Sequence, residues 1–368
     1  MAHTTACRCP GVQRVSGTCV VRLPTWLGDT LMALPVLRAV QRSSERTVLW
    51  GPPAYRELLA AAGLPTEYLP YRRRRGLAGA SDAIHAAADL LHLRADAVLL
   101  LPNAFEPALL AAVAGIPRRI GYATDGRGPL LTDIVADTRP RHTVHEADRF
   151  AYLAEHAGFG PAEPDDLRLD HAGLDRYAAE ILPAGATYVG IIVGSANDPA
   201  RRWPVASYAR LIDLLQQKWG AHPLLLGSDA DRALNDEVGW MCKVETMNLS
   251  GGSLTDLAAT LVRCRMIVGN DTGGTHLAAS LGRPTAVIVG PTDPARSCPR
   301  GDHVVILSAQ RFCQPCGYGD CPLDHACMKK LDPDRVFAQL EPLWNRPAYL
   351  NALCRDGAEK GVDTRCAP

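Results

Sequence analysis

Two polar segments of this chain each follow an apolar run and precede a helical pattern, the position at which α/β sheets carry functional groups. The first is Leu-Pro-Thr-Trp-Leu-Gly-Asp-Thr at 23–30. Its carboxylate, Asp29, could act as a general base at the carboxyl edge of a strand. Gly28 can adopt backbone angles closed to other residues and lets a ligand approach closely. On spacing alone, Asp29 or Thr30 could equally be no more than a helix cap.

The second segment is Gly-Asn-Asp-Thr-Gly-Gly-Thr-His at 269–276. Paired glycines before a helix let backbone N–H groups point at an anion, and the helix dipole adds roughly half a positive charge. The segment therefore predicts a diphosphate cradle, although it has neither the GxGxxG fingerprint nor a Walker lysine. The alternative is an ordinary capped turn between a strand and a helix.

Two further segments carry weaker signals. Gly194-Ser195-Ala196-Asn197 is followed by Arg201-Arg202-Trp203-Pro204, where a guanidinium could neutralise a phosphate. Gly227-Ser228-Asp229 follows the next strand pattern and could meet a ribose or a base.

Four cysteines lie close together in the pattern Cys313-x2-Cys316-x4-Cys321-x5-Cys327. Their thiolates could close a tetrahedral site for zinc or iron. The loop could instead be a structural one, with its cysteines reduced or paired in disulfides. Three histidines, His142, His145 and His156, lack a carboxylate pattern that would make them ligands, so they are expected to be surface or core residues.

The elements that must position these groups alternate along the chain. Apolar runs predict strands at 19–23, 47–50, 96–101, 118–122, 188–193, 222–227, 265–269, 285–289 and 303–307. Helical patterns lie between them, for example at 30–42, 205–218, 254–263 and 275–281. Continuous apolar strands separated by helices indicate parallel sheets covered on both faces, and hence an α/β doubly wound architecture.

A length of 368 residues favours two domains. The alternation pauses in a stretch rich in Pro, Gly and Asp at 158–171, so the linker is expected between about residue 158 and residue 185. We divide the chain into an N-terminal extension at 1–17, a first domain at 18–170, a second domain at 171–345 with a Cys-rich loop at 312–328, and a C-terminal tail at 346–368.

The overall charge excludes some classes of protein. Lys+Arg and Asp+Glu both number 39, so the formal net charge is zero, which argues against a nucleic-acid-binding protein. The first 16 residues contain no apolar core of a signal peptide. No run approaches the roughly 20 apolar residues that span a bilayer. The sequence therefore predicts a cytoplasmic protein without a transmembrane segment.

In combination, these segments resemble the bacterial heptosyltransferases of glycosyltransferase family 9. The matching pieces, in order, are Pro-Thr-Trp-Leu-Gly-Asp at 24–29, Leu-Pro-Asn at 101–103, Ala-Gly-Ile-Pro at 114–117, Arg-Ile-Gly at 119–121, Arg-Trp-Pro at 202–204, Gly-Ser at 227–228, Asn-Asp-Thr-Gly at 270–273 with His276, and Gly-Pro-Thr-Asp-Pro at 290–294. The resemblance covers about residues 19 to 340, and its first half is similar to the lipopolysaccharide heptosyltransferase II subgroup. It implies a GT-B fold, in which two Rossmann-like domains face each other across a cleft, and an ADP-heptose donor.

The resemblance also implies roles for individual residues. Asp29 matches the catalytic base and Asp271 a residue that faces the donor sugar. Arg201 falls where the family commonly has a lysine on phosphate, and a guanidinium fork there changes the contact geometry. The remaining donor-binding matches are Arg202, Thr272, Gly273, Gly274 and His276, with looser matches at Ser195 near phosphate and Asp229 near the nucleoside.

The implied reaction is transfer of heptose to a lipopolysaccharide inner-core acceptor with inversion, and no metal needs to bridge the diphosphate. The run Arg72, Arg73, Arg74 and Arg75 lies on the acceptor side and could bind an anionic saccharide, or could be a solvated loop. The enzyme is then expected at the inner membrane face as a peripheral protein. In some members of the family a similar cysteine-rich loop binds iron, which keeps a structural Zn or Fe site open.

Three alternatives stand beside this interpretation. The first keeps the donor but replaces the acceptor with a small natural product, such as an aminocyclitol or nucleoside antibiotic, or with a protein. The second is a nucleotide-sugar epimerase of similar shape, which the segment at 24–29 disfavours. The third is a non-enzymatic metal or redox module, for which Asp29 would have to be dispensable.

Overall fold

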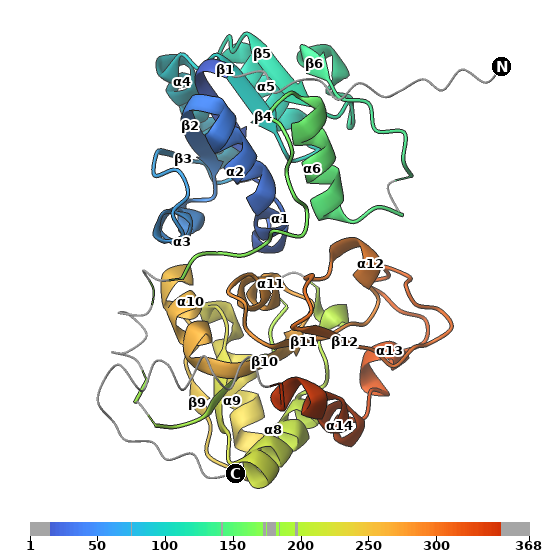
Figure 1. Cartoon of the computed structure of the whole chain (residues 1–368). Coiled ribbons are helices and arrows are strands. Elements are labelled where there is room, and N and C mark those ends of the chain that lie inside the picture. Colours follow the sequence, from blue (N-terminus) through green and yellow to red (C-terminus); the bar gives the residue numbers. More distant parts are fainter. Residues whose placement is uncertain are drawn as a thin grey trace, which may run out of the picture. The chain divides into compact units, whose positions relative to one another are not determined.

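The computed structural model describes residues 15–346 except 75, 141–142, 172–173, 175–181, 184 and 196–197. The chain divides into two compact units, Met1–Asp170 and His171–Pro368 (Figure 1). Each unit has its own sheet and its own core, so each can be understood from its own residues.

The sheet of the first unit has six parallel strands in the order β3-β2-β1-β4-β5-β6. The strands are β1 (Val15–Arg22), β2 (Ser44–Gly51), β3 (Tyr68–Pro70), β4 (Ala97–Leu100), β5 (Arg118–Gly121) and β6 (Asp133–Ile134). The chain order reverses between β1 and β4, which is the switch point where α/β sheets gather loops from neighbouring strands. Asn103 lies in the loop that follows β4, and Asp29 lies in the first turn of α1, the helix that follows β1.

Helices cover both faces of this sheet. They are α1 (Leu27–Met32), α2 (Leu34–Ser43), α3 (Arg56–Ala61), α4 (Gly76–Leu93), α5 (Phe105–Val113) and α6 (Glu146–His156), with short 3-10 turns at Pro53–Tyr55 and Gly128–Leu130. Figure 1 shows α2 and α6 side by side, and α2 also contacts α1. On the other face, α4 packs against α5 over a core that includes Val20, Val98 and Leu100.

The second unit repeats this plan with the strand order β12-β11-β10-β7-β8-β9, all parallel. Its strands are β7 (Tyr188–Ile192), β8 (His222–Leu226), β9 (Met247–Asn248), β10 (Cys264–Asn270), β11 (Thr285–Ile288) and β12 (Val304–Leu307). Its helices are α8 (Val205–Trp219), α9 (Arg232–Met241), α10 (Leu254–Arg263), α11 (Gly273–Ser280), α12 (Pro294–Ser297), α13 (Ala326–Lys329) and α14 (Pro333–Trp344), with 3-10 turns at Pro199–Arg201 and Asp229–Asp231. A core of apolar side chains from β7, β10, β11, α8 and α14 fills one face of the sheet.

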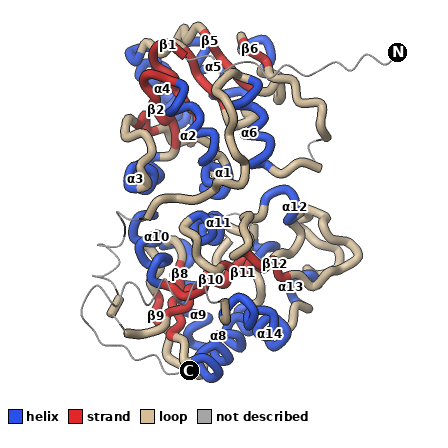
Figure 2. The backbone as a smooth tube through the Cα atoms, viewed as in Figure 1, coloured by secondary structure: helices blue, strands red, loops and turns tan. Residues whose placement is uncertain are grey.

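The nine strands expected from the sequence are all present, and three more appear, β3, β6 and β9 (Figure 2). Each of the three is two or three residues long, which is too short to show an alternating or apolar pattern. The helix expected at 30–42 is two helices, α1 and α2, that meet at Ala33. Pro35 explains the break, because it has no N–H to donate to the preceding turn.

Residues 1–14 and 347–368 lie outside the described residues, and with them Cys7, Cys9 and most of both expected extensions; His142 also lies outside them. His145 is a buried cap of α6, whose Nδ1 accepts a hydrogen bond from Ala147 N at 3.1 Å, and His156 stacks on Tyr152. Within the part of the chain that the structure describes, no helix is long and apolar enough to cross a membrane.

Candidate active site

Asp29 lies in the first turn of α1, directly after the loop that leaves β1, and its side chain is half-buried. The N-cap of this helix is Trp26, which makes no side-chain cap hydrogen bond, so the interpretation of Asp29 as the cap residue is wrong. The hydroxyl of Tyr55 donates to the carbonyl of Thr25 at 2.7 Å and holds the loop in place. Burial raises the pKa of Tyr55 well above its usual range, and the negative charge of Asp29 adds to this, which identifies Tyr55 as a close neighbour of the carboxylate.

Gly28 does not have the backbone conformation expected from the sequence. It lies inside α1, is buried, and is absent from the glycines with positive φ. The loop between β1 and α1 therefore turns without a left-handed residue, and α1 begins three residues before the predicted start. The early start moves Asp29 from the loop into the first turn of the helix.

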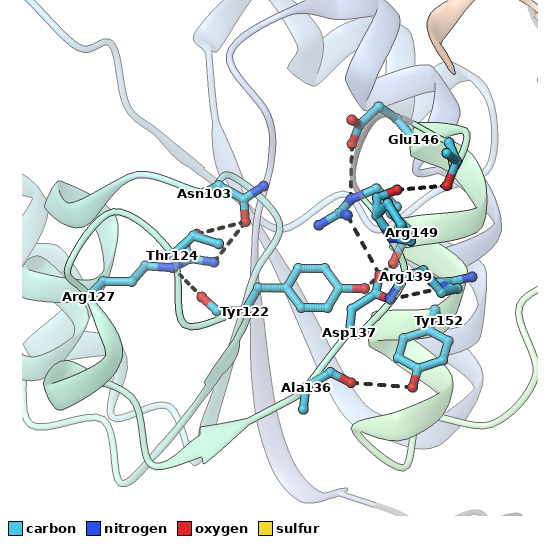
Figure 3. A network of polar contacts seen from close by, with 12 residues as sticks. Asn103, Tyr122, Thr124, Arg127, Ala136, Asp137, Arg139, Glu146, Arg149 and Tyr152 are labelled. Atoms are coloured by element: carbon cyan, nitrogen blue, oxygen red, sulfur yellow. Dashed lines mark hydrogen bonds and ion pairs between the residues drawn. The ribbon is translucent and has the colours of Figure 1, made fainter. Parts of the chain in front are cut away.

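A buried arginine network orients the loop that follows β4 (Figure 3). The Oδ1 atom of Asn103 accepts hydrogen bonds from Thr124 Oγ1 at 3.2 Å and from Arg127 Nη2 at 3.3 Å. Arg127 is fully buried and also donates to the carbonyl oxygens of Tyr122 and Pro102. Because the Oδ1 atom of Asn103 is bound to Thr124 and Arg127, the amide nitrogen points away from these two residues. Asn103 lies just after the carboxyl end of β4.

The same network continues to α6 through acidic groups. Asp137 accepts two hydrogen bonds from the Arg139 guanidinium, at 2.8 and 3.0 Å, and lies 3.7 Å from Arg149 Nη1. The Tyr122 hydroxyl donates to the carbonyl of Arg149 at 2.6 Å. These contacts tie the segment after β5 to α6, as Figure 3 shows. The contacts of Asp137 and Tyr122 with Arg149 have no local signal in the sequence, because the partners are 12 and 27 residues apart.

The arginine run at 72–75 is not a uniform basic patch. Arg73 forms an ion pair with Glu106 at 2.7 Å, and Arg74 forms one with Asp82 at 2.5 Å. Arg75 lies outside the described residues. Arg72 is exposed, and the structure records no ion pair or side-chain hydrogen bond for it among the described residues. Two of the four predicted acceptor-binding arginines are therefore already paired with carboxylates of their own unit.

The predicted diphosphate cradle lies at the start of α11. Gly273 and Gly274 are its first two residues, so the helix begins two residues earlier than expected. The hydroxyl of Thr275 accepts a hydrogen bond from Thr272 N at 3.2 Å and donates to the carbonyl of Thr272 at 2.8 Å. A Cβ at Gly274 would lie 3.0 Å from Ile192 Cδ1, so glycine allows the helix N-terminus to pack closely on β7.

Asp271 is buried just before this helix and has three polar neighbours. Its Oδ2 accepts a hydrogen bond from Thr292 Oγ1 at 2.9 Å and lies 3.8 Å from Arg201 Nη1. Its Oδ1 lies 3.9 Å from His276 Nε2. Arg201 also pairs with Asp198 at 3.3 Å. The structure thus brings together Arg201, Asp271 and His276, which the sequence predicted separately, and adds Thr292, to which no role was assigned.

The other residues predicted in this unit make different contacts. Ser195 is buried after β7, and its carbonyl accepts a hydrogen bond from Arg202 Nη2 at 3.1 Å. The side chain of Asp229 is 82% exposed and pairs with Arg232 at 3.1 Å. Asp231, which the sequence analysis passed over, is the buried carboxylate of this segment: it accepts from Ser228 N at 2.9 Å and from Ser228 Oγ at 2.6 Å. The Ser-x-x-Asp spacing is a capping-box signal that could have revealed it.

The four clustered cysteines line one small cavity of ≈ 10 Å³, together with Pro291, Arg311, Tyr318 and His325. All four are free thiols, and Cys327 is the buried one. Burial raises the pKa of Cys327, and the negative charges of Cys316, Cys321 and Cys313 raise it further. The Sγ atom of Cys321 accepts a hydrogen bond from Leu323 N at 3.3 Å. Among the described residues, no three His, Cys, Asp or Glu side chains are arranged as metal ligands.

The family model of glycosyltransferase family 9 (heptosyltransferase) matches residues 85–327, which is more than half of the chain. The chain belongs to glycosyltransferase family 9. This membership makes it a glycosyltransferase, and the two parallel six-stranded sheets are the Rossmann-like domains of the GT-B fold.

One heptosyltransferase of E. coli and one solved structure of an E. coli heptosyltransferase are similar to this chain over nearly their whole length, and another solved structure shares its fold. Lipopolysaccharide heptosyltransferase 2 of Escherichia coli K12 is 28% identical over 343 residues, covering 87% of this chain and 96% of that protein. The solved structure of E. coli ADP-heptose LPS heptosyltransferase II superposes with a TM-score of 0.75 and 25% identity, covering 89% of this chain and 98% of that one. The iron-containing dodecameric glycosyltransferase TibC of enterotoxigenic E. coli shares the fold, with a TM-score of 0.56 and 15% identity over 94% of this chain and 78% of that one.

Proposed function

We propose that this enzyme transfers a heptose from ADP-heptose to a saccharide of the lipopolysaccharide inner core. The observation that carries the proposal is the likeness to lipopolysaccharide heptosyltransferase 2, which extends over 96% of that relative and therefore includes the residues of both sheets. In this proposal the reaction depends on Asp29, in the first turn of α1, and on Asp271 with the N-terminus of α11 in the second unit.

In this proposal the second unit binds the donor. The N–H groups of the first turn of α11, at Gly273 and Gly274, take the diphosphate, and the positive end of the helix dipole offsets its charge. Arg201 and Arg202 supply further positive charge, with Thr272 and His276 beside the cradle. Asp271 faces the donor sugar, Ser195 lies near the phosphates, and Asp229 meets the nucleoside.

Asp29 is the proposed general base. It accepts the proton of the acceptor hydroxyl as that oxygen forms a bond to the anomeric carbon of the heptose. The bond between this carbon and the ADP oxygen breaks on the opposite face, and ADP leaves with the bonding electron pair, so the configuration inverts. A free Asp has a pKa of about 3.9, so Asp29 enters the reaction as the carboxylate and takes the proton late, when the hydroxyl has become acidic.

The acceptor is proposed to be an anionic saccharide, with the run Arg72, Arg73, Arg74 and Arg75 on its binding side. Arg72 is the strongest candidate, because Arg73 and Arg74 already have carboxylate partners. A lipid-linked acceptor would bring the enzyme to the cytoplasmic membrane face as a peripheral protein. The competing acceptors are a small natural product, such as an aminocyclitol or nucleoside antibiotic, and a protein.

The test is release of ADP from ADP-heptose by purified protein with each class of acceptor. An Asp29→Asn variant should lose at least about 100-fold in kcat, the usual contribution of a general base, and should bind ADP-heptose within about twofold of the wild type. Asp89→Asn, which changes an exposed carboxylate of α4 in the same unit, is the matched control and should turn over normally. Full turnover by Asp29→Asn would overturn the assignment of the base. If ADP is released only with a different class of acceptor, that class is the acceptor and the proposed one is wrong.

We also propose a structural zinc or iron ion at the four-cysteine loop. The type of donor fits, because four cysteines line one cavity and thiolates are the ligands that these metals take in closed structural sites, although the four side chains are not arranged as ligands in this structure. Cys313, Cys316, Cys321 and Cys327 would hold the ion and so cross-link the loop. Its role would be structural, and no step of the transfer depends on it.

Metal analysis of anaerobically purified protein tests this second proposal. About one equivalent of zinc or iron per chain is expected in the wild type, and a Cys316→Ser variant should lose most of it. Cys242→Ser, which changes a half-buried cysteine at the end of α9 outside the loop, is the control and should keep the metal. Metal-free wild-type protein, or equal metal in Cys316→Ser and the wild type, would rule out the site.

A further inference from the structure

One of the two oxygens of the Asp271 carboxylate accepts a hydrogen bond from a residue in the segment that follows the neighbouring strand. Thr292 Oγ1 donates to Oδ2 at 2.9 Å, and this contact is shorter than those with Arg201 and His276, which lie 3.8 and 3.9 Å away. Asp271 follows β10 and Thr292 follows β11, and these two strands are paired in parallel. A carboxylate that is 5% exposed and bound on one oxygen has one preferred orientation.

The backbone on both sides of Thr292 is fixed by other contacts. The carbonyl of Pro291 accepts hydrogen bonds from Cys316 N at 3.1 Å and from Gly317 N at 2.8 Å, both in the cysteine loop. The side chain of Gln314 donates to the carbonyl of Gly290 at 2.7 Å. On the other side, Asp293 caps α12 by accepting from Ala295 N at 3.1 Å. Thr292 is therefore a hydroxyl on a rigid segment that is aimed at one carboxylate oxygen.

We infer that Thr292 is a positioning residue for donor recognition. Its hydroxyl donates a hydrogen bond to Oδ2 of Asp271, and this orients the carboxylate so that Oδ1 can accept hydrogen bonds from the hydroxyl groups of the donor sugar. The inference rests on the proposed function, in which Asp271 faces that sugar. It gives Thr292 no contact with the donor itself. Removing the hydroxyl lets the carboxylate rotate, which weakens its hydrogen bonds to the sugar and leaves the contacts of the ADP moiety unchanged.

The experiment compares the binding of ADP-heptose and of ADP by calorimetry. Thr292→Val keeps the size and branching of the side chain and removes the hydroxyl. It should weaken ADP-heptose about tenfold, as expected when a hydrogen bond to a charged group is lost, and should change ADP affinity by less than about twofold. Thr292→Ser restores the hydroxyl and should bind both ligands like the wild type. Thermal denaturation of the variants shows whether the fold is intact.

A double-mutant cycle distinguishes positioning from direct contact. If Thr292 acts through Asp271, Thr292→Val adds nothing to the loss already caused by Asp271→Asn. Additive losses, equal weakening of ADP and ADP-heptose, or failure of Thr292→Ser to restore binding would each overturn the inference. Failure of the proposed function looks different: the wild-type protein itself would then bind ADP-heptose no better than ADP, and the inference would fall with it.

Discussion

The side chain of Asn270 and the backbone N–H of Trp203 are joined by a hydrogen bond of 3.1 Å, although 67 residues separate them in the chain. The same amide accepts from the Tyr208 hydroxyl at 2.9 Å and donates to the carbonyl of Val193 at 2.6 Å. Asn270 is fully buried. It therefore joins the end of β10 to the end of β7 and to the segment that carries Arg201 and Arg202, so two segments that read as separate motifs form one structural unit.

Replacing Asn270 with Ala should destabilise the second unit strongly. The change leaves the Trp203 N–H, the Tyr208 hydroxyl and the Val193 carbonyl buried without this partner, at about 1–3 kcal/mol for each unsatisfied group. We expect a loss of at least about 3 kcal/mol in the free energy of unfolding. Urea unfolding followed by tryptophan fluorescence measures it. A loss below about 1 kcal/mol would mean that water replaces the amide at little cost.

Gly290 should not tolerate a side chain. A Cβ at this position would lie 2.4 Å from Met328 Sδ and 2.9 Å from Met328 Cγ, and Met328 belongs to the buried core. Gly290→Ala is expected to cost about 1–3 kcal/mol of stability through overpacking.

The double variant Gly290→Ala/Met328→Ala tests the cause of that loss. If contact with Met328 causes it, the Gly290 substitution should cost much less in the Met328→Ala background, which a double-mutant cycle of unfolding free energies detects. An unchanged cost in that background would show that the strain lies elsewhere.

The buried Asp137 predicts a specific dependence of stability on pH. Hydrogen bonds from Arg139 lower its pKa, and its side chain is 3% exposed beside Arg149. Since the folded-state pKa lies below the unfolded value of about 3.9, the stabilisation is fully present above about pH 4 and is lost as the pH falls through the folded-state pKa. At pH 7, Asp137→Asn should cost about 3 kcal/mol, because Arg149 then loses a buried partner.

Unfolding curves of the wild type and of Asp137→Asn at neutral pH and at acid pH provide the measurement. The gap between the two proteins should shrink as the solution becomes more acid than about pH 4. A gap of constant size across this range would mean that the charge of Asp137 contributes nothing and that only its hydrogen-bonding shape matters.

Arg72 and Arg94 make a matched pair for the proposed acceptor side. Both are exposed, but Arg94 follows α4 and lies next to the start of β4, at the opposite end of the sheet from Asp29 and Asn103. Arg72→Ala should raise the KM for an anionic acceptor about fivefold, in line with about 1 kcal/mol for an exposed charge, and the effect should shrink with added salt. Arg94→Gln should leave KM unchanged. Equal effects of the two substitutions would remove Arg72 from the acceptor site.

The cysteines should differ widely in their rates of alkylation by iodoacetamide. Burial raises the pKa of both Cys19 and Cys264 to about 12, so at pH 8 these thiols stay protonated and enclosed, while Cys313, Cys316 and Cys321 are only half-buried. Mass spectrometry of metal-stripped native protein should find the loop cysteines modified first. In urea, where the protein is unfolded, all the cysteines should be alkylated at comparable rates. Early modification of Cys19 or Cys264 in native protein would contradict the packing of the two cores.

The parts of the fold predictable from sequence are those with local patterns. Nine apolar strands and the α/β architecture could be predicted, because most residues of these strands are buried and helical patterns lie between the strands. The strands β3, β6 and β9 could not, because two or three residues give no period.

The candidate site likewise contains residues that a local sequence pattern predicts and contacts that it does not predict. Asp29 and Asp271 stand out because each follows a strand within a distinctive run of polar residues. The capping-box spacing of Ser228 and Asp231 is a local signal for the buried acid of this segment, but its close approach to Gly194 and Gly227, which follow two different strands, is not visible in the local sequence. The pair Thr292 and Asp271 could have been inferred, since residues that follow adjacent parallel strands meet at one edge, but only once β10 and β11 are known to be neighbours.

The short strands β3, β6 and β9 occupy three of the four outer positions of the two sheets. An edge strand offers unpaired N–H and C=O groups to any other extended chain, and this is a common start of aggregation. Edges of two residues, as in β6 and β9, or of three ending in a proline, as in β3, provide almost no template for such pairing. Only β12, with four residues, offers a longer edge among the described strands. If the chain self-associates through its sheets, β12 is where that contact should form.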